Sequence, residues 1–381
     1  MESNRWSSLN IRENIPLASL TTFKIGGPAR YFIELTDTAQ IPDALQFAHS
    51  INLRAFILGG GSNLLVSDEG LESVVIHIRN RGILFREEAN HVLLDVAAGE
   101  VWDDVVRESV QRGLWGIENL SRIPGQAGSI AVQNVGAYGV EASEVVQSVE
   151  VFDRIEQRVT ILKATDCKFA YRTSIFNTSA KGRYIILSVT LALHREVNRR
   201  IGYPDLREWF RGNTEPSLEE IRAAIMAIRD RKFPFPAESI EGNAGSFFKN
   251  PLLNEQEYDA LEANFAEQYP DSLERLRTIR NRFPMKDAIK IPGAFLLEVC
   301  GLKGFRIGNA MLNPAQPVIV LNATGTATAS EILTLVRDVR DKVFSTTGIT
   351  LAIEPELIGF SAKELSTYNF SEAEIRQYIN Y

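Results

Sequence analysis

The chain has 381 residues, a length that favours two or three domains, each large enough to bury its own core. Its formal net charge of −7, from 41 basic and 48 acidic residues, argues against a general binder of nucleic acid or of acidic membranes. The two cysteines, Cys167 and Cys300, form no CxxC pair, so we expect reduced thiols and no metal cluster. We find neither a secretory signal pattern nor a run of about 18 apolar residues, so the expected location is the cytoplasm.

Residues 1–80 are expected to form a first α/β lobe. Short β-prone runs at 31–35, 56–58 and 74–78 predict strands. The apolar residues of segment 37–50 recur at helical spacing and predict a helix between the first two strands.

Residues 81–210 are expected to form a second lobe around a glycine-rich stretch at 123–139. Alternating apolar residues predict strands, and helical spacing stopped by Gly113 predicts one helix. These elements are strands at 91–97, 148–152 and 184–193 and a helix at 101–112.

Residues 211–357 are expected to form a third, substrate-binding domain, followed by a tail at 358–381. Ser217 and Glu220 form a capping-box pattern at the start of this domain. The remaining predicted elements are a polar helical segment near 253–280, a strand at 318–321, an amphipathic helix with Ser330 as N-cap and Gly348 as its stop, and a strand at 349–353.

Two glycine-rich stretches are candidate cofactor loops. Glycine lets backbone N–H groups approach a diphosphate closely, and small residues among amides can line a flat ring system. A plain tight turn and an irregular buried loop are the alternatives, since neither stretch is a Walker A loop or GxGxxG. The candidate residues are Gly59, Gly60, Gly61, Ser62 and Asn63 in the first stretch and Pro124, Gly125, Gly128, Ser129, Asn134, Gly136 and Ala137 in the second.

Three further motifs carry polar groups suited to chemistry. Arg172 lies between aromatic residues in YRTSIF and could hold a carboxylate bidentately, although a surface salt bridge is an equal alternative. Ser246 lies between glycines and phenylalanines in GNAGSFFKNP, without a histidine beside it, and could donate a proton. Glu354 and Glu356 in EPE could point the same way on an extended segment, or end a solvated strand.

Taken in order, these motifs resemble one family. The series consists of GGGSN, IPGQAGS with QNVGAYG, YRTSIF, GNAGSFFKNP and EPE, from about Thr22 to Glu356. It is similar to that of the UDP-N-acetylenolpyruvoylglucosamine reductases. The resemblance implies an α+β fold: a vanillyl-alcohol-oxidase-like two-lobe FAD-binding domain plus a C-terminal α+β substrate domain. It also implies FAD as cofactor, NADPH as reductant and UDP-N-acetylglucosamine enolpyruvate as substrate.

The resemblance also implies roles for individual residues. Ser246 matches the family's proton donor, while Arg172 and Glu356 match the pair that acts on the enolpyruvyl carboxylate. Hydride transfer to the vinyl carbon builds negative charge towards that carboxylate, and a cation beside it stabilises the charge. The implied substrate-binding residues are Tyr138, Tyr171, Tyr203, Arg229, Lys232 and Asn250.

Some of these residues also fit simpler interpretations, and the chain departs from the family in places. Tyr203 could be a packing aromatic, and Arg229 and Lys232 could be helix-end charges that face water. Residues 253–290 look longer and more charged than usual, and 311–316 and Ile358 lack basic residues found in relatives.

Two other function classes remain open. Another FAD oxidoreductase of the same superfamily would share the first two lobes, and a non-catalytic nucleotide-binding protein could share the fold. We expect a monomer that binds neither nucleic acid nor a membrane.

Overall fold

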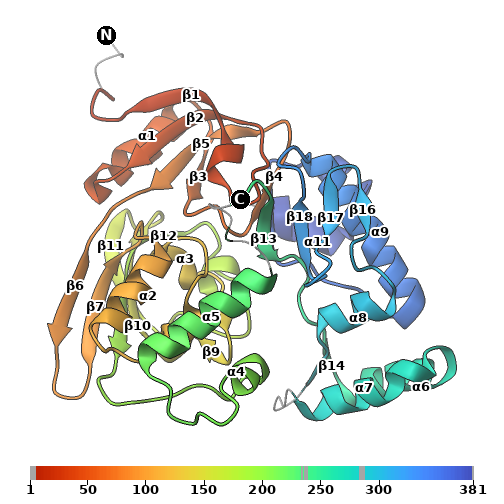
Figure 1. Cartoon of the computed structure of the whole chain (residues 1–381). Helices are drawn as coiled ribbons and strands as arrows, with labels where there is room; N and C mark the ends of the chain where they lie inside the picture. Colours follow the sequence, from red (N-terminus) through yellow and green to blue (C-terminus); the bar gives the residue numbers. More distant parts are fainter. Residues whose placement is uncertain (1–5, 233–234, 236–238, 283–287, 380–381) are drawn as a thin grey trace.

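Three sheets of four or five strands follow one another along the described chain. We describe a computed structural model, which covers residues 6–232, 235, 239–282 and 288–379 (Figure 1). Helices and strands are mixed in every part of it, as the predicted α+β class requires. Within the described residues, no helix is both long and apolar enough to cross a membrane.

The first lobe is a four-stranded sheet in the order β1-β2-β5-β3, covered by helix α1. β2 and β3 both pair in parallel with β5, whereas β1 pairs antiparallel with β2. The predicted strands and helix of this lobe are confirmed. The elements are β1 (Ile11–Pro16), β2 (Pro28–Leu35), α1 (Ile41–Ser50), β3 (Arg54–Leu58) and β5 (Leu71–Ile78).

The second lobe is a five-stranded antiparallel sheet in the order β11-β10-β12-β7-β6. Its inner face packs on α2, and Trp102 of that helix is almost completely buried. The three strands and the helix predicted here are confirmed. The elements are β6 (Ile83–Glu87), β7 (Val92–Ala97), α2 (Trp102–Gln111), α3 (Ala127–Ile130), β8 (Gly136–Ala137), β9 (Val140–Glu141), β10 (Val146–Asp153), β11 (Arg158–Lys163) and β12 (Tyr184–Leu193).

Two further helices complete the second lobe, and the second of them, at 218–232, was expected in the third domain. α4 (Pro204–Trp209) and α5 (Leu218–Lys232) bury their apolar residues in the same core as α2. The expected capping box is present, because Ser217 Oγ accepts from the Glu220 N–H at 3.2 Å and the Glu220 carboxylate accepts from the Ser217 N–H at 2.7 Å. The third domain therefore begins after α5, later than the boundary expected at residue 211.

The third domain is built on a four-stranded sheet in the order β13-β18-β17-β16, with the long helix α9 against it. The segment near 253–280 forms two helices, α6 and α7, that pack against each other. The elements are β13 (Gly242–Ser246), β14 (Leu252–Leu253), α6 (Glu255–Gln268), α7 (Pro270–Arg282), β15 (Ile289–Lys290), α8 (Gly293–Val299), β16 (Arg306–Ile307), β17 (Ala310–Leu312), β18 (Ile319–Asn322), α9 (Ala329–Thr347), β19 (Glu356–Ile358), α10 (Ala362–Ser366) and α11 (Glu372–Ile379).

The ends of this domain differ from the sequence predictions in three places. Helix α9 is capped by Thr328 and not by Ser330, because the Thr328 hydroxyl and the Glu331 carboxylate form a reciprocal capping box. Gly348 ends the helix with φ of 72°, as expected. Segment 349–353 forms only one isolated bridge, and the final strand is β19. The expected tail is folded, since α10 and α11 bury side chains in the core of the domain.

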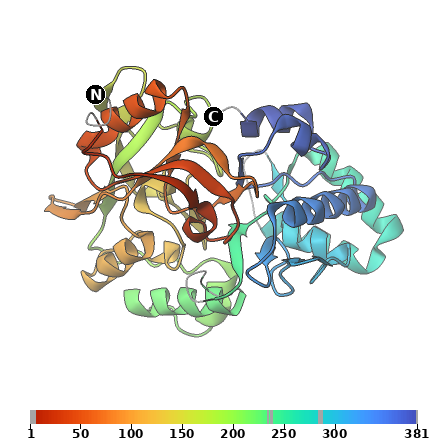
Figure 2. The same ribbon diagram turned by 90° about the horizontal axis from the view of Figure 1, so that it is seen from above.

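The third domain is attached directly to the first lobe (Figure 2). β19 pairs in parallel with β4 (Leu64–Val66) of the first lobe. The Asp68 carboxylate accepts the N–H groups of Ala329 and Ser330 at 2.7 and 3.1 Å, and so caps the first turn of α9 from the other lobe. These contacts place β19 and the start of α9 close to the first glycine-rich loop.

Candidate active site

The two predicted cofactor loops lie against each other where the first two lobes meet. A Cβ added at Gly60 would lie 2.6 Å from the Gly125 Cα, and one at Gly59 would lie 2.8 Å from the Ser129 Oγ. A Cβ at Gly125, whose φ is 118°, would lie 2.6 Å from the Ser62 Oγ. Only glycine therefore permits this approach. The result is a cradle lined largely by backbone, which suits the diphosphate and ring edges of FAD.

Asn63 and Asn134 have different positions in these loops. Asn63 Nδ2 donates to Gln133 Oε1 at 2.8 Å and to the Glu354 carbonyl at 3.3 Å, so it joins all three parts of the chain. The Asn134 side chain is buried and bonded to Glu141, Ala170 and Ser143. The Asn134 side chain therefore holds the loop in place, and the expectation that Asn134 binds the cofactor stays a prediction.

Strained backbone gathers around the same loops. Of the ten described non-glycine residues with left-handed φ values, four lie in or against these loops: Arg122 at 61°, Asn134 at 46°, Tyr138 at 49° and Arg172 at 57°. Such conformations cost energy and persist where surrounding contacts impose them, often at functional sites. Three of the four were predicted as site residues from sequence.

The Arg172 side chain is mostly buried and is held by two hydrogen-bond acceptors. Its Nη2 donates to the Gly136 carbonyl at 2.9 Å, and its Nε lies 3.2 Å from Glu354 Oε1. The side chains of Arg172 and Glu354 are only 20% and 12% exposed. Burial raises the pKa of Glu354, and the positive charges of Arg172 and Lys249 oppose that rise. The site therefore contains a cation whose charge is only partly screened by water.

The glutamate that contacts Arg172 is Glu354, and the expected action of Glu356 on the substrate carboxylate stays a prediction. Glu356 lies on β19, and its carboxylate is 3.8 Å from Lys181 Nζ. The Glu354 N–H donates to the Phe247 carbonyl, whereas the Glu356 N–H donates to the Asn63 carbonyl. The two glutamates thus bond to different segments of the chain, with Pro355 between them, and simple i, i+2 alternation does not apply.

Ser246 ends β13 and is exposed. It directly precedes Phe247, the backbone partner of Glu354. Gly245 before it has φ of 72°, a conformation that favours glycine. The fold therefore brings Ser246 and the Arg172–Glu354 pair onto adjoining segments.

Tyr171 and Asn250 lie together on the other side of Arg172. Asn250 Nδ2 donates to the Tyr171 hydroxyl at 3.4 Å, and the Arg172 guanidinium lies 5.1 Å from the Tyr171 ring centre. Lys290 Nζ is 4.3 Å from the same ring, and burial together with Arg172 lowers its pKa. Sequence analysis missed Lys290, because nothing around it forms a recognisable motif.

The remaining predicted substrate residues form a second group. Tyr138 and Tyr203 make an edge-to-face contact with ring centres 5.4 Å apart. Lys232 Nζ lies 5.7 Å from the Tyr138 ring centre and 2.6 Å from the Asp205 carboxylate. Burial raises the pKa of Tyr138 to about 12; the positive charge of Arg229 opposes the rise and Asp205 adds to it. Arg229 stands nearby and adds a second cation to the group.

A groove of about 760 Å³ continues from Tyr171 and Asn250 towards α6. Lys249 lies in its wall, next to Asn250. The other lining residues are Pro251, Leu252, Leu253, Glu257, Ala260, Leu261, Asn264, Thr347, Gly348, Ile349, Thr350 and Ala352. The α6–α7 hairpin therefore shapes the surface beside the site.

Known proteins resemble this chain over almost its whole length. An FAD binding domain model matches residues 29–161, and the model of the UDP-N-acetylenolpyruvoylglucosamine reductase C-terminal domain matches residues 236–358. UDP-N-acetylenolpyruvoylglucosamine reductases from Neisseria gonorrhoeae and Xylella fastidiosa are 36% and 34% identical to it, covering 91% and 92% of this chain and 96% of each relative. The crystal structure of the reductase from Thermus caldophilus superposes with a TM-score of 0.61 at 23% identity, covering 92% of this chain and 99% of that one. The chain belongs to the UDP-N-acetylenolpyruvoylglucosamine reductase family.

Proposed function

We propose that this protein reduces the enolpyruvyl group of UDP-N-acetylglucosamine enolpyruvate to give UDP-N-acetylmuramate, a precursor of peptidoglycan, with NADPH as reductant and FAD as cofactor. The observation that carries the proposal is the half-buried pair of Arg172 and Glu354, which lies where the cofactor loops meet the third domain. The named relatives and the two matching domain models support the same substrate and cofactor.

The reaction adds a hydride to one vinyl carbon and a proton to the other. FAD, when bound, accepts hydride from NADPH and supplies it to the substrate. The loops of Gly59–Asn63 and Pro124–Ser129 would hold that group through backbone contacts, since their close approach leaves no room for side chains at the glycines.

Arg172 would hold the substrate carboxylate and stabilise the negative charge that develops on it. A guanidinium in a poorly hydrated site stabilises such charge strongly, because little water competes with it. Glu354 would fix the Arg172 guanidinium through Nε and the Gly136 carbonyl would fix it through Nη2, which leaves Nη1 for the substrate. Ser246 would deliver the proton from the adjoining strand.

The second group of residues would bind the nucleotide part of the substrate. Arg229 and Lys232 supply positive charge near Tyr138 and Tyr203, which suits a diphosphate covered by aromatic rings. Tyr171 and Asn250 would close the sugar end. We infer that the protein works as a cytoplasmic monomer.

A turnover assay tests the proposal. We expect NADPH oxidation that requires the enolpyruvyl sugar nucleotide and gives a product heavier by two hydrogen atoms. A flavin-containing protein that oxidises NADPH equally with and without this substrate would instead be another FAD oxidoreductase. A protein that takes up no FAD would be a nucleotide-binding relative without catalysis.

A further inference from the structure

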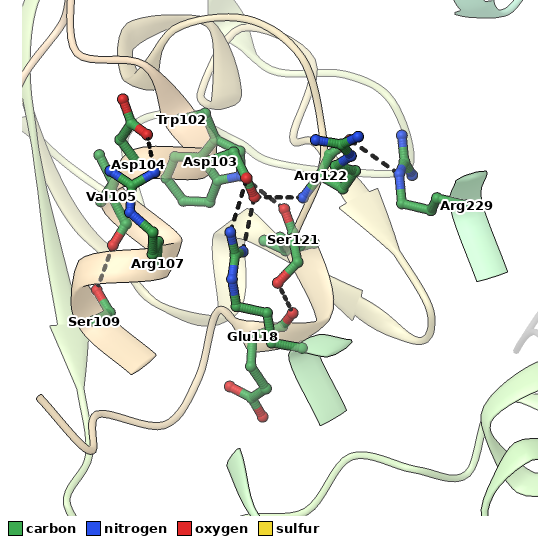
Figure 3. Close-up of polar contacts among 12 residues, drawn as sticks. Trp102, Asp103, Asp104, Val105, Arg107, Ser109, Glu118, Ser121, Arg122 and Arg229 are labelled. Carbon is green, nitrogen blue, oxygen red and sulfur yellow. Dashed lines mark hydrogen bonds and ion pairs between the residues drawn. The ribbon is translucent and has the colours of Figure 1, made fainter. Parts of the chain in front are cut away.

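Asp103 lies at the centre of a charged network outside the groups described above (Figure 3). Its two carboxylate oxygens accept Nη1 and Nη2 of Arg222, both at 2.8 Å. The same carboxylate accepts the backbone N–H of Arg122 at 2.5 Å. The Asp103 and Arg222 side chains are 14% and 10% exposed, so this pair is largely withdrawn from water. It ties α2 to α5.

The bond to Arg122 fixes the start of the second cofactor loop. Arg122 has a left-handed φ of 61°, which an L-residue adopts only at a cost. Trp102, next to Asp103, donates its backbone N–H to the Gly125 carbonyl at 3.0 Å. The first turn of α2 therefore holds the loop at both Arg122 and Gly125.

The same loop residue contacts Arg229 at the far end of α5. Arg229 Nε donates to the Arg122 carbonyl at 3.0 Å, as Figure 3 shows. Because Asp103 holds the N–H of Arg122 in a strained conformation, it also determines where the carbonyl of that residue points. Asp103 therefore contacts α5 twice: directly at Arg222, and through Arg122 at Arg229.

We propose that Asp103 is a positioning residue for the reaction, which fixes the Arg229 end of α5 relative to the cofactor loop. On the proposed function, this sets where the nucleotide diphosphate lies relative to the flavin. Asp103 touches neither the substrate nor the reacting atoms, and it acts through Arg122 and Arg229. Arg222 anchors it from the other side.

The charge state of Asp103 agrees with this arrangement. Burial acts to raise its pKa, but the hydrogen bonds from Arg222 and from the Arg122 N–H outweigh burial and hold the pKa below its usual value. Three donors share two oxygens, a demand that an asparagine with one acceptor oxygen cannot meet. Asp103→Asn therefore releases part of the network while keeping the size of the side chain.

The test measures the affinity of purified FAD-loaded protein for UDP alone, together with steady-state kinetics. We expect Asp103→Asn to weaken UDP binding and raise the KM for the sugar nucleotide about tenfold, with a much smaller change in kcat. Asp104→Asn is the matched control, because the Asp104 side chain is 46% exposed and pairs only with Arg107 in the described structure. Equal UDP affinity of the two variants would refute the proposal.

A double-mutant cycle separates positioning from general destabilisation. If Asp103 acts through Arg229, Asp103→Asn should change UDP affinity little once Arg229→Ala is present, whereas independent effects would add. Additive losses would overturn the proposal.

If Asp103→Asn fails to fold, Arg222→Lys keeps the charge, loses the two-point contact, and should also weaken UDP binding. Unchanged affinity in Arg222→Lys would count against it.

These outcomes are distinct from failure of the proposed function. A wild-type protein that binds UDP but cannot reduce the enolpyruvyl substrate would reject the function. The dependence of UDP affinity on Asp103 would still be measurable in that protein.

Discussion

At the scale of single residues, the two carboxylates of the EPE motif differ in burial and in their contact with Arg172. Glu354 is 12% exposed and contacts the guanidinium, whereas Glu356 is 28% exposed and faces Lys181. A carboxylate in poor contact with water holds its partner more firmly than an exposed one, because fewer water molecules compete for the cation. The two glutamates of one motif therefore have different neighbours.

Paired substitutions test this assignment. Glu354→Gln should slow reoxidation of the reduced flavin by substrate by about 10²- to 10³-fold, the usual range for losing one preorganised group in a site. Glu356→Gln should slow the same step if Glu356 acts on the substrate carboxylate, as the motif predicts. Rapid mixing of prereduced protein with substrate measures both rates. A large loss in Glu356→Gln with a normal Glu354→Gln would assign the role to Glu356 alone.

His77 is a buried titratable residue directly behind the first cofactor loop. It is 4% exposed on β5, and Leu58, just before Gly59, is its strand partner. Burial, helped by Arg79, lowers the pKa of His77 to about 4, although Glu34 acts in the opposite direction. His77 is therefore neutral in the folded protein near neutral pH.

The folded-state pKa lies below the ordinary value of 6.5, so the unfolded chain takes up the proton first as the pH falls. The stability that His77 contributes is present above pH 6.5 and is lost as the pH falls towards 4. Between pH 7 and 5 we expect wild type to lose about 2 kcal/mol more than His77→Phe in urea unfolding of the FAD-loaded protein. Equal losses would mean that another group titrates.

At the scale of elements, the two cofactor loops depend on the absence of side chains. Gly60 meets Gly125 across the boundary between the lobes, and both are followed by residues of the proposed FAD site. Glycine therefore occupies the positions where two backbones must approach, although it loses more conformational entropy on folding than other residues do.

Gly60→Ala should expel or weaken the cofactor. The added Cβ would lie 2.6 Å from the Gly125 Cα, which cannot move aside as a flexible side chain would. We expect a loss of bound flavin of at least about tenfold in affinity, measured by flavin content after gel filtration. Gly202→Ala is the control, because nothing lies within 4 Å of its Cβ. Equal flavin content in both variants would contradict the close approach.

Many of the loops and helices could be predicted from sequence, for reasons that differ between elements. The glycine spacing of loops 59–63 and 123–139 predicts close backbone contact, because few other residues permit it. The amphipathic pattern of α5 shows that one face is buried but not which lobe buries it. Its place beside α2, and hence the role of Asp103, depends on contacts between residues 119 positions apart in the chain.

Which of Glu354 and Glu356 contacts Arg172 also exceeded what a sequence pattern can resolve. Alternation along a strand predicts that both point the same way, but the chain leaves one bridge at Ile353 and enters another strand after Pro355. Lys290 reaches Tyr171 from β15, far along the chain and outside any motif. Such residues are found only when the fold brings the segments together.

At the scale of the whole molecule, three parts of the chain contribute to one site. Asn63 bonds Gln133 of the second lobe and Glu354 of the third domain, while β4 and β19 fasten the first lobe to the third. The cofactor loops come from the first two parts, and Glu354 and Ser246 come from the last. The proposed chemistry needs the cofactor loops as well as the residues of the third domain, because hydride supply and charge stabilisation are separate tasks.

The most direct test of this division is an anaerobic rapid-mixing experiment in which wild type and Ser246→Ala receive NADPH first and the enolpyruvyl sugar nucleotide second. In wild type the flavin absorbance should bleach with NADPH and return with substrate. In Ser246→Ala bleaching should be nearly normal and the return slow, because only the second step needs its proton. Bleaching without return in wild type would reject the substrate, and a Ser246→Ala protein impaired in bleaching instead would contradict the role given to the third domain.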